Sequence, residues 1–290
     1  MPRIHPSAIV STEARLGEDC EIGPNCVLSG AVTLGAGVRL VAGVHLSGPV
    51  EVGAGTLLYP GVCLGFPGQD FKFKPGMATA GVKVGSNCVL REHVTLHAAT
   101  KPDAPTSIGD ACYLMVGSHL GHDARAGNNV ILVNGAALAG HSLVGDNATI
   151  GGCCGVHQFT RVGRFAFMSG GTAVSMDVPP FCIVAERQRV AGINRVGLRR
   201  AGFARDHITM IDQAFREVFR GHLPRAEQIE RLTELGKDCP PVMEMAQFVK
   251  DAKRAICPGP GRPPRLLTTW LHFRRRGVDV PEGGDEAEVV

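Results

Sequence analysis

The placement of the histidines in this sequence is the first indication of a functional site. Five of the eleven histidines lie in one part of the chain, at His97, His119, His122, His141 and His157. Asp123 directly follows His122. An imidazole ring exchanges a proton near neutral pH and also binds metal ions, and a neighbouring carboxylate can orient it. These residues predict proton transfer or metal binding if the fold brings them together, whereas scattered surface histidines are the plain alternative.

A six-residue repeat predicts how these histidines are positioned. Apolar residues recur at every sixth position over 4–64, 84–96 and 108–174. This period fits neither an α-helix nor an alternating strand, but it fits a coil of three short strands with about 18 residues per turn. Stacked turns bury a continuous core and satisfy their backbone groups between rungs. We therefore expect an all-β parallel β-helix over residues 1–190.

The two interruptions of the repeat place the histidines on one face. Repeats about 18 residues apart stack at about 4.8 Å per rung, so those at 120, 138 and 156 share a column. Removing the extra residues of the interruptions adds the repeats at 64 and 96 to this column. Loops at about 65–83 and 100–107 should then leave the coil beside the histidines. We take this column as the predicted site.

Composition argues against several classes of protein. The net charge is only +3, which gives no electrostatic case for binding nucleic acid. Neither a signal peptide nor a stretch long enough for a transmembrane helix is visible, so we expect a cytoplasmic protein without an integral membrane segment. Half of the ten cysteines occupy the small inward position of the repeat, and we interpret them as reduced packing residues: Cys20, Cys26, Cys88, Cys112 and Cys154.

Seven motifs make the chain similar to one family of hexapeptide-repeat acyltransferases. They are GQDFK at 68–72, REHVTLH at 91–97, GSHLGHD at 117–123, LAGH at 138–141, GGCCGVHQF at 151–159, DVPPF at 177–181 and GINRVGLRRAGF at 192–203. With these motifs, the sequence from about residue 4 to about residue 255 resembles the UDP-N-acetylglucosamine O-acyltransferases that begin lipid A biosynthesis.

The resemblance implies a fold, an assembly and a reaction. The coil would be left-handed, against the usual handedness of parallel crossovers. The protein would be a homotrimer in which neighbouring subunits share the site. A 3-hydroxyacyl chain would move from the phosphopantetheine of acyl carrier protein to the 3-hydroxyl of the sugar in UDP-GlcNAc, without a further cofactor and without a metal.

The resemblance also assigns roles to the histidine column. His122 matches the general base, Asp123 matches the residue that supports it, and the amide of Gly140 matches the donor that stabilises the oxyanion. The matching substrate contacts are Asp70, Lys72, His97, His119, His141, His157 and Gln158.

Further matches lie beyond the column. Asn194 and Arg200 match residues that hold the nucleotide, and Gly170 matches the position that sets acyl chain length, where it would leave room for a long chain. Val196 and Ala201 depart from the glutamate and arginine that are common in the family. We expect these departures to affect binding of the UDP-sugar more than the acyl-transfer chemistry.

The periodicity becomes helical after the repeat ends at Pro179. We expect a helical domain over 191–257, in which one helix ends near Gly221, a second begins at Pro224 and a third covers about 241–255. Residues 258–290 extend beyond the resemblance. Their composition predicts a linker and a partly disordered extension, to which we assign no function.

Several alternatives stay open from the sequence. The same base would serve N-acyl transfer to a 3-amino UDP-sugar, and a diverged paralogue could use another sugar-nucleotide acceptor. A zinc enzyme of the β-helix carbonic anhydrase type is the alternative from another class, because His119, His122 and His141 are suitable zinc ligands. A non-catalytic scaffold would leave the histidine column unexplained.

Overall fold

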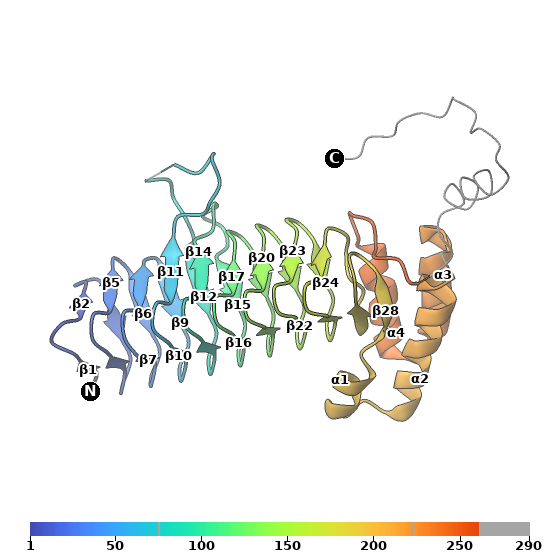
Figure 1. Ribbon diagram of the computed structural model, residues 1–290, viewed down its shortest axis with the longest axis horizontal. Coiled ribbons are helices and arrows are strands. Elements are labelled where there is room, and N and C mark those ends of the chain that lie inside the picture. Colours follow the sequence, from blue (N-terminus) through green and yellow to red (C-terminus); the bar gives the residue numbers. More distant parts are fainter. Residues whose placement is uncertain (75, 222, 261–290) are drawn as a thin grey trace, which may run out of the picture.

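The computed structural model describes residues 1–74, 76–221 and 223–260, which form a long parallel β-helix that ends in a group of helices (Figure 1). Three sheets run along the coil, and each turn of the chain adds one short strand to each sheet. The repeat sets the register: Leu120 pairs with Leu138, and Leu138 pairs with Val156. Their side chains point inward and are almost fully buried, which confirms the predicted core.

The strands alternate among the three sheets in chain order. The first sheet holds β1 (Arg3–Ile4), β4 (Glu21–Ile22), β7 (Arg39–Leu40), β10 (Leu57–Leu58), β13 (Val89–Leu90), β16 (Tyr113–Leu114), β19 (Ile131–Leu132), β22 (Thr149–Ile150), β25 (Phe167–Met168), β27 (Cys182–Val184) and β28 (Val190–Ile193). The second sheet holds β2 (Ile9–Val10), β5 (Val27–Ser29), β8 (His45–Ser47), β11 (Cys63–Phe66), β14 (Thr95–His97), β17 (His119–Leu120), β20 (Ala137–Leu138), β23 (Gly155–Val156) and β26 (Ala173–Val174). The third sheet holds β3 (Arg15–Leu16), β6 (Val32–Leu34), β9 (Val50–Val52), β12 (Val82–Val84), β15 (Thr106–Ile108), β18 (Arg125–Ala126), β21 (Leu143–Val144) and β24 (Arg161–Val162).

The five inward cysteines are buried and unpaired, as predicted. Corners between strands need a residue in the left-handed region, and Asn129 and Asn147 fill two of them with φ of 54° and 59°. Asp123 and His141 occupy equivalent corners, both with φ of 59°. Two predicted site residues are therefore fixed by the same backbone geometry that turns the coil.

Both interruptions of the repeat leave the second sheet as loops beside one column. Leu64 pairs with Leu96, and Leu96 pairs with Leu120, so the extra residues are excluded from the coil. The first loop covers 67–81 and the second covers 98–105. The stacking of the repeats at 64, 96, 120, 138 and 156 is thus confirmed.

Helices follow the last strand. They are α1 (Arg195–Arg200), α2 (Arg205–Ala214), the π-helical segment η1 (Phe215–Phe219), α3 (Arg225–Leu235) and α4 (Pro240–Lys250). Pro224 precedes α3 as predicted, whereas α4 ends at Lys250, before the predicted boundary. In the described part of the chain, none of the helices combines the length and apolar character needed to cross a bilayer. Most of the predicted extension, residues 261–290, lies outside the described residues.

Candidate active site

A groove of about 560 Å³ runs along the outer face of the second sheet, from β14 to β26. Successive side chains of a strand point to opposite faces, so the residue beside each buried leucine or valine faces this groove. The floor of the groove carries only small residues at its outward positions, Ala137, Gly155 and Ala173. The groove therefore has room for a long, thin ligand.

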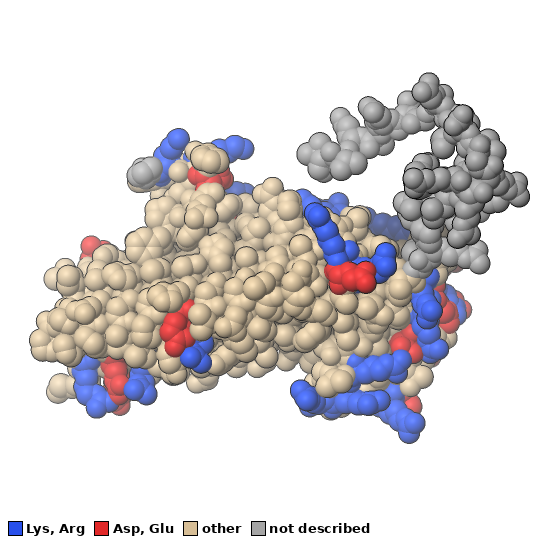
Figure 2. Space-filling model, in the orientation of Figure 1, with Lys and Arg blue, Asp and Glu red and all other residues tan. Residues whose placement is uncertain are grey.

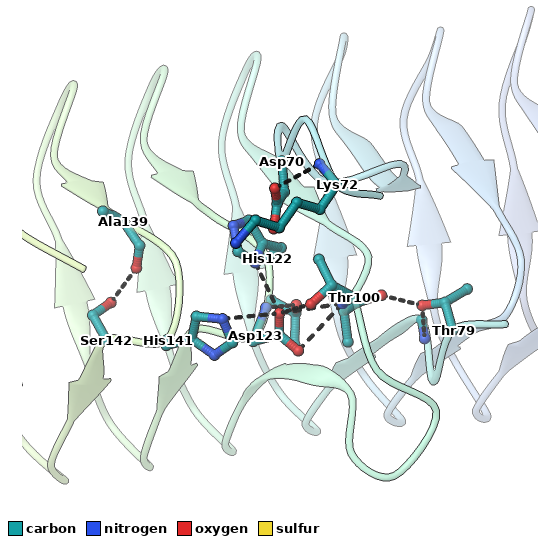
Figure 3. A network of polar contacts seen from close by, with 12 residues as sticks. Asp70, Lys72, Thr79, Thr100, His122, Asp123, Ala139, His141 and Ser142 are labelled. Atoms are coloured by element: carbon teal, nitrogen blue, oxygen red, sulfur yellow. Dashed lines mark hydrogen bonds and ion pairs between the residues drawn. The ribbon is translucent and has the colours of Figure 1, made fainter. Parts of the chain in front are cut away.

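His122 lines this groove and forms a hydrogen-bonded pair with Asp123 (Figure 3). The Nδ1 atom of His122 lies 2.8 Å from Oδ2 of Asp123. The exposed fractions of their side chains are 16% and 8%. Because Nδ1 faces a carboxylate, it carries the proton, and the lone pair of Nε2 remains free to accept another. Adjacent residues of a strand would point apart, but the corner at Asp123 brings these two side chains together.

The second loop and the next corner complete the surroundings of Asp123. Thr100 donates to this carboxylate from its hydroxyl, at 2.7 Å, and from its backbone N–H. Nε2 of His141 lies 3.6 Å from the same Oδ2 atom. Burial alone would raise the pKa of the Asp123 carboxyl, but the hydrogen bonds from His122 and Thr100 outweigh burial and lower the pKa. The carboxylate is thus charged at neutral pH.

His141 is held between Asp123 and an aromatic ring. Its imidazole stacks on Phe159, with 4.6 Å between ring centroids and planes 3° apart. Burial lowers the pKa of His141, although the charge of Asp123 opposes this shift. A neutral ring at this position donates or accepts hydrogen bonds without adding positive charge beside His122.

His97 and His119 form a second pair in the groove. Their ring centroids lie 4.8 Å apart in an edge-to-face arrangement, and Nδ1 of His119 lies 2.7 Å from the hydroxyl of Thr95. Burial, followed by the proximity of His97, lowers the pKa of His119 to about 4. Nδ1 of His97 is buried and has no hydrogen-bond partner among the described residues.

Two glycines allow the chain to approach His122 closely. A Cβ atom on Gly140 would lie 2.7 Å from both Cε1 and Nε2 of His122, and one on Gly68 would lie 2.8 Å from its Cβ atom. The amide of Gly140 lines the groove and donates no hydrogen bond within the described part of the chain. An N–H group in this position can bind an oxygen that develops negative charge next to His122.

The first loop brings Asp70 and Lys72 over the site, as Figure 3 shows. The backbone N–H of Lys72 donates to Oδ1 of Asp70 at 2.9 Å, which shapes the tip of the loop. His157 and Gln158 line the groove from the corner after β23. Of the residues predicted in the histidine column, those that line the groove are His97, His119, His122, Gly140, His157 and Gln158. Asp123 and His141 lie beside His122 without lining the groove, and Asp70 and Lys72 lie on the loop over it.

Comparisons with known proteins agree with this geometry. A family model described as Udp N-acetylglucosamine O-acyltransferase, Domain 2, matches residues 177–257. A relative from Burkholderia orbicola, named acyl-[acyl-carrier-protein]–UDP-N-acetylglucosamine O-acyltransferase, is 44% identical over 88% of this chain and 99% of its own length. One of the same name from Anaeromyxobacter sp. strain K is 47% identical over 87% of this chain and 98% of its own.

This chain belongs to the UDP-N-acetylglucosamine O-acyltransferase family. It is therefore an acyltransferase. The solved UDP-N-acetylglucosamine acyltransferase of Francisella novicida superimposes with a TM-score of 0.85 at 30% identity, over 90% of this chain and 94% of the other. The shared fold is the left-handed β-helix with helices at its C-terminal end, as predicted.

Three residues that the family resemblance predicted lie away from the groove. Asn194 precedes α1, where its side chain accepts the N–H of Gly197 and donates to the carbonyl of Phe165, each at 3.0 Å. Arg200 is exposed on α1, and Gly170 lies in the corner after β25. None of the three lines the groove. Their roles in the family reaction stay predictions.

Sequence reasoning missed Thr100, Phe159 and Gly68 as part of the site. Phe159 follows HQ at a corner, and the position of the corner in the repeat was the available signal. Thr100 and Gly68 lie in loops, whose paths the repeat does not specify.

His122, Asp123 and His141 have ligand atoms within 4.8 Å of one another and could surround a cation. The hydrogen bond between His122 and Asp123 already uses atoms of two of these residues, and family membership does not favour the zinc alternative.

Proposed function

We propose that this protein transfers a 3-hydroxyacyl chain from acyl carrier protein to the 3-hydroxyl of UDP-GlcNAc, the first step of lipid A biosynthesis. The proposal rests chiefly on the His122 ring, which has Asp123 at its Nδ1 atom and the Gly140 backbone beside its Nε2 atom. The names of the relatives support the same reaction.

Each of these groups has a role in the proposed reaction. Nε2 of His122 takes the proton of the sugar hydroxyl as its oxygen attacks the thioester carbonyl, and Asp123 stabilises the resulting imidazolium. The Gly140 amide binds the oxyanion of the tetrahedral intermediate. Collapse of this intermediate breaks the carbon–sulfur bond, and the proton passes from His122 to the departing thiolate. A thioester is already activated, so the step needs neither a metal nor a redox cofactor.

The surface supports an acidic, carrier-bound donor. The small residues of the groove floor leave space for an acyl chain and its pantetheine arm. Lysine and arginine side chains gather at the helical end, over α1 and α2 (Figure 2). Arg199 and Arg200 are exposed there and suit an acidic carrier protein.

The active assembly that we propose is a cytoplasmic homotrimer. Val116 and Ile131 leave 38% and 36% of their surface exposed on the coil, and an interface with another copy there would bury them. A neighbouring copy would also bring its residues toward the groove, so Asn194, Arg200 and Gly170 could act across an interface. Light scattering should give three times the chain mass of 30.6 kDa.

An acyl-transfer assay tests the proposed function. The purified protein is given a panel of 3-hydroxyacyl carrier proteins with UDP-GlcNAc or its 3-amino analogue. We expect product with UDP-GlcNAc, and a loss of about 10² to 10⁴ in kcat for His122→Ala. His45→Ala, on the same sheet but outside the groove, serves as the matched control. Absence of product with every donor and acceptor would refute the proposal.

The same panel decides between oxygen and nitrogen as acceptor. The relatives are named as O-acyltransferases, which does not favour the N-acyl alternative. Val196 is 58% exposed on α1 and Ala201 follows this helix, so neither contacts the histidine column within one chain. We expect both departures to alter KM for the nucleotide sugar rather than kcat.

A further inference from the structure

Residues at the start and at the end of the second loop form hydrogen bonds with a single residue, Asp123. At regular corners, the left-handed residue donates its N–H to a carbonyl on the rung below, as Asn129 does to Asp110 and His141 does to His122. At Asp123 the chain below has left the coil as the 98–105 loop. The hydroxyl of Thr106, where the loop rejoins, accepts the Asp123 N–H at 2.7 Å instead.

The carboxylate of Asp123 is held by the other end of the same loop. Thr100 donates its hydroxyl to Oδ2 at 2.7 Å, and its N–H lies 3.2 Å from each carboxylate oxygen. Figure 3 shows this carboxylate enclosed by Thr100, His122 and His141. Since hydrogen bonds to a charged acceptor are strong and directional, they fix the rotation of the carboxylate and, through it, the ring of His122.

The two loops brace each other behind Thr100. The Thr79 hydroxyl donates to the carbonyl of Ala99, and the N–H of Ala80 donates to the carbonyl of Lys101 at 3.0 Å. The carbonyl groups of both residues that flank Thr100 are therefore tied to the first loop. This bracing leaves Thr100 little freedom to follow a moving carboxylate, so the loop determines where the carboxylate lies.

We propose that Thr100 is a positioning residue that aims the His122–Asp123 pair at the reacting atoms. This inference rests on the proposed acyl transfer. Thr100 acts only through Asp123 and donates no hydrogen bond to another described side chain. A misplaced general base loses rate even when both substrates bind normally, because proton transfer depends on the alignment of the ring.

The test compares Thr100→Val with Thr100→Ser. Valine keeps the shape of the side chain but removes the hydroxyl donor, and serine keeps the donor. We expect Thr100→Val to lower kcat about tenfold or more with KM unchanged for both substrates, and Thr100→Ser to restore most of the rate. Thr100→Ala is measured beside them, so that the inference does not depend on the folding of one variant.

Thr56→Val is the matched control. Thr56 is a buried threonine that donates to the carbonyl of Gly85 at 2.9 Å and accepts from the N–H of Cys88 at 3.1 Å, away from the groove. We expect this variant to lower the melting temperature while kcat stays within twofold of wild type. If Thr100→Val lowers kcat no more than Thr56→Val does, the inference is overturned.

A double-mutant cycle separates positioning from general support of the fold. In an Asp123→Asn background the pair is already broken, so adding Thr100→Val should lower kcat less than twofold further. Fully additive losses would show that Thr100 acts by another route and would overturn the inference. A wild-type protein that transfers no acyl group would instead refute the proposed function, which is measured first.

Discussion

A methyl group added to Gly140 would lie 2.7 Å from Nε2 of His122, so these two residues share one wall of the groove. The proposed base and the proposed oxyanion donor therefore face the same small volume. Both come from second-sheet corners one rung apart, and the hydrogen bond from the His141 N–H to the carbonyl of His122 holds these corners together.

The contact predicts that Gly140→Ala removes activity without unfolding the protein. The new methyl group would push the imidazole away from the amide, and we expect kcat to fall by about 10². The melting temperature should change by only a few degrees, because the displaced ring borders an open groove. Gly192→Ala, where the structure leaves open space, is the control, and equal kcat in both variants would contradict the prediction.

Asp123→Asn tests the charge of the supporting carboxylate. Asparagine keeps the size of the side chain but no longer stabilises the imidazolium or fixes the proton on Nδ1, so we expect kcat to fall by about 10² to 10⁴. Initial rates at saturating substrates measure this loss. Asp146→Asn is the control, since Oδ1 of Asp146 only accepts the N–H of Asn128 and an amide oxygen can replace it. A variant Asp123→Asn with wild-type kcat would exclude the proposed role.

His119 predicts a loss of stability in mild acid. Its pKa is about 4 in the folded protein, against an ordinary histidine value of 6.5, so the unfolded state binds the proton more readily between these values. The neutral ring of His119 makes its full contribution to the free energy of unfolding above about pH 6.5. This contribution declines as the pH falls toward 4, and the loss at pH 5 is at most about 2 kcal/mol. Melting temperatures at pH 7.5 and pH 5 should differ less for His119→Gln than for wild type. An identical difference would count against this assignment.

Arg161 predicts a large effect from an ion pair with the buried Asp177 at the end of the coil, where the same side chain also contacts α4. Its Nε donates to Oδ2 of Asp177 at 2.7 Å, and its Nη2 donates to the carbonyl of Phe248 on α4. Asp177 is 1% exposed, so Arg161→Met would leave a buried charge unpaired and cost about 3 to 5 kcal/mol. Arg39→Met, which breaks an exposed pair with Glu21, should cost less than about 1 kcal/mol. Thermal unfolding compares them, and similar melting temperatures would argue against the buried pair.

The sequence by itself determined the coil and the column. A period of six has only a few structural solutions, and each inward leucine or valine tolerates no other register, because a slip by one residue would turn the core outward. The spacing of His97, His122, His141 and His157 on that register placed them side by side before any coordinates were known. The motifs around these residues were enough to indicate the family.

Only the tertiary structure decided how the site is held. The 98–105 loop has no repeat, so its sequence gave no sign that Thr100 would point at Asp123, and the stacking of Phe159 on His141 depends on two corners that lie one rung apart. The predicted helix boundaries were similarly approximate, because the ends of helices depend on capping and packing. For example, α4 ends at Lys250 and not at about residue 255 as expected. Local pattern specifies which residues face a surface, whereas the distances and hydrogen bonds between them arise from contacts between segments far apart in the chain.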